Sequence, residues 1–77
     1  MKTIPLRDHE MPHDKYSAFE LELQRRNAVL KATVEVYTTP EGVKYARLTD
    51  PILVFDETRT DVAALRKLVE VHGFQTR

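Results

Sequence analysis

The chain has 77 residues, which is enough for one domain with a small core and makes a large catalytic cavity unexpected. Lysine and arginine together number 12 and balance 12 aspartates and glutamates, so no overall charge attracts the protein to nucleic acid or to an anionic membrane. The absence of cysteine excludes disulfides, thiolate metal sites and cysteine nucleophiles, and no apolar run approaches the ~20 residues of a membrane span. We therefore expect a cytoplasmic protein.

Residues 1–14 contain two prolines and no sustained hydrophobic period. They are predicted to form an N-terminal arm that is either mobile or extended across the domain, with Ile4 and Leu6 docked as an edge strand. Residues 15–77 are predicted to form a single α+β domain.

The arm contains His9-Glu10-Met11-Pro12-His13, a formal match to the zinc motif H-E-x-x-H. Zinc ligation at this spacing needs both histidines on one helix, and proline is strongly unfavourable in a helix interior. We therefore predict no metal site, no cofactor and no enzyme activity.

The next segment is ambiguous between helix and strand. Ser17 followed by Glu20 fits a capping box, Tyr16 and Leu21 fit a hydrophobic staple, and Asn27 suits the left-handed residue after a helix. These signals predict a short helix that buries Phe19 and Leu23. In the alternative, residues 19–24 alternate apolar and polar side chains and form a further strand.

The segment from Leu30 to Leu48 carries the clearest signal. Thr39-Pro40-Glu41-Gly42 fits a three-residue hairpin loop, in which proline presets φ and glycine adopts the left-handed conformation. The register that follows pairs Tyr37 with Tyr45, Glu35 with Arg47, Val36 with Ala46, and Val34 with Leu48. The face with Val34, Val36, Ala46 and Leu48 is predicted to be buried, and the face with Thr33, Glu35, Tyr37, Val43, Tyr45 and Arg47 to be exposed.

Ile52-Leu53-Val54-Phe55 is an unbroken apolar run, which predicts burial on both faces. Because Pro51 disfavours a tight turn, this run either continues the second hairpin strand after a bend or forms a third strand. A C-terminal helix follows, with Thr58 as its cap, Val62, Leu65, Leu68 and Val69 as its buried stripe, and Gly73 with Phe74 at its end.

These elements predict an α+β fold of order αβββα, a hairpin plus third strand with both helices on one sheet face. If residues 19–24 are a strand, only the C-terminal helix covers the sheet. The double-stranded RNA binding domain has the same element order, but its last helix begins with lysines. Here that region is Asp56-Glu57-Thr58-Arg59-Thr60-Asp61, so we do not assign the chain to that family.

The exposed hairpin face is the main candidate for function, because tyrosine and arginine are enriched at interface hot spots. Its candidate partner-binding residues are Tyr37, Tyr45, Glu35, Arg47, Lys44 and Val43. We predict a small interaction or regulatory protein that binds a larger protein, such as an accessory factor or a phage-type inhibitor. The open sheet edges also allow a homodimer. The alternative is a nucleic-acid-binding module that uses Arg25, Arg26, Lys31 and Arg47.

Overall fold

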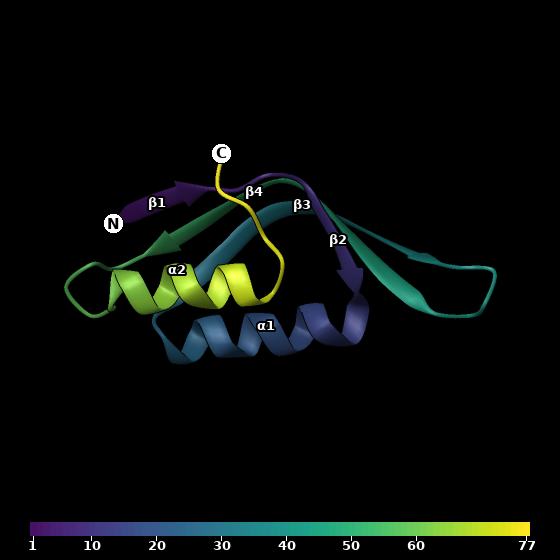
Figure 1. Cartoon of the computed structure of the whole chain (residues 1–77), viewed down its shortest axis with the longest axis horizontal. Coiled ribbons are helices and arrows are strands. Elements are labelled where there is room, and N and C mark those ends of the chain that lie inside the picture. The colour runs from purple at the N-terminus through teal and green to yellow at the C-terminus, as the bar shows by residue number, and fades with distance from the viewer.

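The computed structural model describes all 77 residues, which form four strands and two helices in the order ββαββα. The strands are β1 (Lys2–Pro5), β2 (His9–Pro12), β3 (Ala28–Thr38) and β4 (Lys44–Phe55), and the helices are α1 (His13–Arg25) and α2 (Val62–Val71). The strands form one antiparallel sheet, and both helices lie on the same face of it (Figure 1). The predicted α+β class is confirmed. The αβββα order is wrong, because the N-terminal segment adds two strands and residues 52–55 belong to β4.

Strand β4 is central to the sheet. Along one edge it pairs with β3 from the hairpin loop to its far end. Along the other edge it pairs with two short strands, β2 over residues 45–48 and β1 over residues 52–55. The N-terminal segment is therefore extended, and Ile4 and Leu6 are buried as the docked-strand alternative predicts. Residues 19–24 lie within α1, so the alternative of a strand there is wrong.

The β3–β4 hairpin has the predicted loop and register. Thr39 donates its backbone N–H to the Val43 carbonyl at 2.9 Å, and Gly42 has a φ of 83°. The four predicted pairs, from Tyr37 opposite Tyr45 to Val34 opposite Leu48, are all present. The turn chemistry therefore determines which side chains face away from the helices.

A β-bulge in β4 interrupts this register between Lys31 and Thr33 of β3. Asp50 has a φ of 50°, and Asp50 and Pro51 together occupy the space opposite one residue of β3. The extra residue reverses the alternation, so Ala46 and Leu48 point inward before it and Leu53 and Phe55 after it. The prediction that Ile52 is buried is consequently wrong, since 40% of its surface is exposed.

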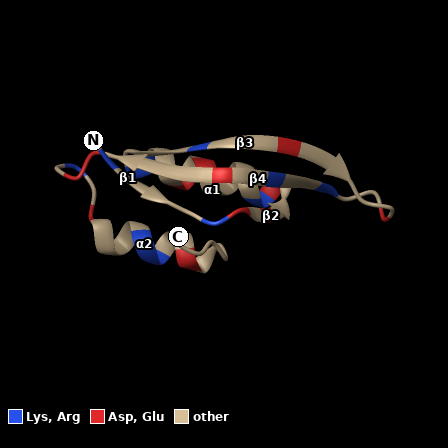
Figure 2. Ribbon diagram, turned by 90° about the horizontal axis from the view of Figure 1, so that it is seen from above, with Lys and Arg blue, Asp and Glu red and all other residues tan.

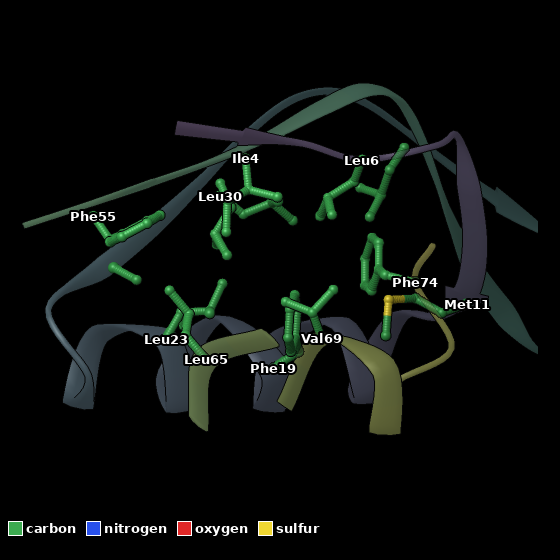
Figure 3. Packing of buried hydrophobic residues seen from close by; sticks show 13 residues of the cluster. Ile4, Leu6, Met11, Phe19, Leu23, Leu30, Phe55, Leu65, Val69 and Phe74 are labelled. Atoms are coloured by element: carbon green, nitrogen blue, oxygen red, sulfur yellow. The ribbon is translucent and has the colours of Figure 1, made fainter. Parts of the chain in front are cut away.

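The core lies between the sheet and the two helices, as Figure 3 shows. It contains Phe19 and Leu23 from α1, and Leu65 and Val69 from α2, as predicted. The prediction that Val34 and Val36 belong to it is wrong, because they are 38% and 53% exposed. These valines lie on the edge strand β3, whereas their partners Leu48 and Ala46 on the central strand β4 are fully buried.

Both helices begin at different residues from those predicted. Helix α1 starts at His13 directly after Pro12, so Ser17 is an interior residue and not a cap. The pairing of β2 with β4 and the restriction that proline places on Met11 keep the chain extended up to Pro12. Helix α2 is capped by Asp61, whose carboxylate accepts from the N–H groups of residues 63 and 64, while Thr58 instead bonds to Asp56.

The helix ends agree with the predictions. Asn27 follows α1 with a φ of 58°, and Gly73 follows α2 with a φ of 88°. The N–H groups of Gly73 and Phe74 bond to the carbonyls of Glu70 and Val69, which is the Schellman pattern. No helix of this fold has the length and apolar character needed to cross a membrane.

The chain beyond Phe74 covers the break between β1 and β2. Arg7 donates its N–H to the Gln75 carbonyl at 2.7 Å, and Leu6 forms an antiparallel bridge with Thr76. The Arg77 side chain donates to the Leu6 carbonyl at 2.9 Å and forms ion pairs with Asp8 and Asp50. This edge of the sheet is therefore interrupted and partly covered.

Candidate functional site

Four side chains gather on the sheet face that carries no helix: Glu10 of β2, Tyr37 of β3, and Tyr45 and Arg47 of β4. We call them the tyrosine platform. The two tyrosine rings stack with centroids 5.9 Å apart and an interplanar angle of 18°. The Arg47 guanidinium lies 5.4 Å from the centre of the Tyr37 ring, within the range of a cation–π interaction.

Glu10 joins the platform from the opposite edge of the sheet. One carboxylate oxygen accepts from the Arg47 Nε at 2.7 Å, and the other accepts from the Tyr37 hydroxyl at 2.8 Å. The register explains this, because Glu10 is paired with Arg47 across β2 and β4. The carboxylate of Glu10 on β2 is therefore hydrogen-bonded to side chains of both β3 and β4.

The hydrogen bonds of Glu10 set the charge states of the platform. Arg47 first, and then Tyr37, lower the pKa of the Glu10 carboxyl by stabilising its ionised form. The same hydrogen bond to Glu10 raises the pKa of the Tyr37 hydroxyl. Glu10 is therefore a weaker base than an ordinary glutamate, and Tyr37 is a weaker acid than an ordinary tyrosine.

The other predicted partner-binding residues lie beside the platform or at the hairpin tip. Glu35 lies opposite Arg47 in the register, but the Arg47 guanidinium is bonded to Glu10 on the other side. Val43 and Lys44 lie at the tip of the hairpin, where Val43 is 45% exposed. Lys44 precedes Tyr45 in β4 and is therefore on the helix side of the strand, so it is not part of the platform face. The rest of the predicted face is present, with Glu10 as an additional member.

The four residues of the predicted nucleic-acid site are not brought together. Arg25 is in the last turn of α1, where it pairs with Glu22, and Arg26 caps the same helix. Lys31 and Arg47 are on the uncovered sheet face, and Arg47 is paired with Glu10. Figure 2 shows acidic and basic residues interspersed along the strands and helices rather than gathered in one place.

The histidine motif of residues 9–13 is not helical. Residues 9–12 form β2, and His13 begins α1, so the two histidines do not lie one helical turn apart. The His9 ring instead packs on Phe74, with centroids 4.5 Å apart. No group of three or more histidine, aspartate or glutamate side chains is placed to hold a metal ion.

A groove of about 490 Å³ lies where β2 meets the two helices, and its lining includes His9, Lys15, Ala18, Val71 and His72. Its histidines pack on the stacked pair Phe19 and Phe74, since the His72 ring is 4.7 Å from that of Phe19. No polar side chain of the protein is buried. The polar residues of the groove are thus accessible to solvent, and Glu10, which also lines it, is bonded to Tyr37 and Arg47.

Glu10 is the platform residue that the sequence patterns did not predict. It contributes only because β2 pairs with β4, and residues 10 and 47 are far apart in the chain. The two prolines of this segment are compatible with an extended chain, but they do not indicate which strand it pairs with or in which register. Comparison with models of known protein families, with curated proteins and with solved structures found no match to this chain.

Proposed function

We propose that the protein binds a larger protein partner through the tyrosine platform and the hairpin end that carries it, here defined as residues 34–47. The observation that supports this most is the exposure of apolar side chains on both faces of that hairpin end. Val36 is 53% exposed on the helix side, and Tyr37 and Tyr45 are only partly buried on the other side. The pairing of β4 with β2 ends at Tyr45, so the tip of the hairpin is a two-stranded ribbon with little stability of its own, and a partner would cover it.

The chemistry of the platform suits a protein surface. Its stacked tyrosines present a rigid amphipathic area, and such residues bind with a small loss of side-chain entropy. Arg47 is oriented by Glu10 before any partner arrives, which lowers the entropic cost of forming a contact. The mixed charges around it favour a partner with both acidic and basic side chains over a uniformly charged polymer. We expect the cytoplasm as the compartment, and a regulatory or accessory role.

The test is affinity capture from the lysate of the native host, with the purified chain immobilised. The Tyr37→Ala and Tyr45→Ala changes are made together, after circular dichroism has established that the variant is folded. We expect the captured partner to be lost. A matched control removes exposed apolar side chains from the helices instead, with Leu21→Ala and Val71→Ala, since these residues are 57% and 73% exposed.

The control variant should capture the same partner as the unaltered chain. If the double tyrosine variant retains every protein that the unaltered chain captures, the platform is not the binding surface and the proposal is wrong. Loss of the partner in the control variant alone would place the binding surface on the helices.

A further inference from the structure

The two edges of the sheet differ in their protection. The β1/β2 edge is broken, contains Pro5 and Pro12, and is covered in the middle by the segment at Thr76. The edge formed by β3 is 11 residues long, contains no proline, and pairs with nothing on its outer side. The bulge that could have distorted this edge lies in β4 instead. A long regular edge of this kind is a template for another strand.

The backbone groups available at this edge follow from the hairpin. Thr39 bonds to Val43 across the loop, so the odd-numbered residues of β3 direct their N–H and C=O groups toward β4. The even-numbered residues, including Val34 and Val36, direct theirs outward. In an added antiparallel strand, the residues whose backbone groups point toward β3 must lie opposite these even-numbered residues. This requirement excludes half of the conceivable registers.

We infer that β3 pairs antiparallel with β3 of a second copy of the chain, about a two-fold axis at Thr33. Thr33 is the middle residue of Ala28–Thr38, so this register uses the whole strand. It also places Lys31 opposite Glu35 of the second copy, twice by symmetry. A two-fold axis at Lys31 would place Lys31 opposite its own copy, and an axis at Glu35 would do the same for Glu35, so like charges would face each other. An axis at a residue adjacent to either of them would leave both Lys31 and Glu35 without an oppositely charged partner.

The same register covers exposed apolar surface. Val34 lies opposite Ala32 of the second copy, and Val36 lies opposite Leu30. The two valines, 38% and 53% exposed in the single chain, gain neighbours on the helix side of the joined sheet. This assembly uses the β3 edge, which includes Tyr37 and Val36 of the hairpin end, but its occupant is a second copy of the chain, so it goes beyond the proposed function and its test needs no other protein.

The first test measures mass by sedimentation equilibrium, where we expect twice the 9.0 kDa of one chain. The Lys31→Glu variant and the Glu35→Lys variant should each dimerise at least roughly tenfold more weakly, because each opposes like charges. An equimolar mixture of the two should recover the dimer, since every cross-strand pair then joins opposite charges. A monomer for the unaltered chain, or no recovery in the mixture of folded variants, overturns the inference.

The second test reports the register and does not depend on Glu35→Lys, which could disturb the pairing with Arg47. The chain has no cysteine, so single cysteines can be introduced and oxidised. At the two-fold axis the Cα atoms of Thr33 and its symmetry mate lie about 4.5 Å apart in a non-hydrogen-bonded pair, within disulfide reach. The Thr33→Cys variant should form a covalent dimer. The Lys31→Cys control should not, because its two copies lie about 13 Å apart.

A dimer with equal cross-linking in both variants, or with none at Thr33→Cys, also overturns the inference.

Discussion

Gly73 is the position where a single added methyl group has the most specific consequence. It follows α2 in the left-handed conformation, with a φ of +88°, and a Cβ there would lie 3.2 Å from the His9 Cε1. The His9 ring cannot move away freely, because it packs on Phe74 at 4.5 Å. Gly42 is a matched control, since its φ is +83° and nothing lies within 4 Å of its Cβ position.

The difference between the two variants isolates the contact with His9. Gly42→Ala incurs the cost of a left-handed side chain, about 1–2 kcal/mol, partly offset by about 0.4–1 kcal/mol from a less flexible unfolded chain. Gly73→Ala has the same two effects, the left-handed side chain and the less flexible unfolded chain, and adds an overpacking cost of about 1–3 kcal/mol against the His9 ring. We therefore expect Gly73→Ala to lower the free energy of unfolding by about 1–3 kcal/mol more than Gly42→Ala.

Urea unfolding followed by circular dichroism measures this difference. The comparison is repeated in a His9→Ala background, where the extra cost of Gly73→Ala should disappear because the ring is absent. Equal costs for the two glycine variants would refute the argument, and so would an extra cost that persists without the His9 ring. Either result would mean that the end of α2 is not held against β2.

Three further predictions concern the core, the end of α1 and the platform. Phe19→Ala should cost about 3–5 kcal/mol in urea unfolding, since the side chain is fully buried, whereas Leu21→Ala on the exposed face of α1 should change stability by less than about 0.5 kcal/mol. Asn27→Gly should stabilise the protein slightly, because φ is 58° there and glycine adopts this conformation without steric cost; a decrease in the melting temperature would contradict this. The platform should make stability depend on pH at both extremes. Because the folded-state pKa of Glu10 is lowered, its contribution is present above the ordinary glutamate pKa and is lost as the pH falls through the folded-state value. The folded-state pKa of Tyr37 is raised, so its contribution to stability is present below the ordinary tyrosine pKa and is lost as the pH rises through the folded-state value. The Glu10→Gln variant should show a weaker dependence of the melting temperature on pH at both extremes.

Features encoded within a few residues were predictable, and those that depend on distant pairing were not. The loop Thr39–Gly42 determines the hairpin register by itself, so the face that carries Tyr37 and Tyr45 followed from the sequence. The same is true of the ends of both helices, where a left-handed residue is required.

The membership of Glu10 in the platform depends on β2 pairing with β4, and no local pattern specifies that register. The exposure of Val36 has a similar origin, since Val36 lies on the edge strand β3 while its partner Ala46 on the central strand is fully buried. Which strand lies at the edge of the sheet is a property of the whole fold.

The bulge at Asp50 and Pro51 shows how one residue can decide which side chains form the core. If Asp50 stayed in the chain but adopted the ordinary strand conformation, the alternation of Ala46 and Leu48 would continue, and Pro51, Leu53 and Phe55 would move to the uncovered face. These three residues are buried in the native fold. Their exposure would cost about 1.5–3 kcal/mol for each large side chain, against a total stability of about 0.05–0.15 kcal/mol per residue.

Deletion of Asp50 removes the extra residue, so β4 alternates regularly and Pro51, Leu53 and Phe55 should still face the helices. The deletion variant should therefore still unfold cooperatively in urea, with a loss of stability from the missing pairing of Asp50 with Arg77. The Asp50→Asn variant is the control, because asparagine tolerates the left-handed conformation and keeps the extra residue in β4. It should fold with a small loss of stability from the weakened pairing with Arg77. Loss of the cooperative transition in the deletion variant, with Asp50→Asn still folded, would contradict the argument, because the extra residue would then be required for more than the alternation of β4.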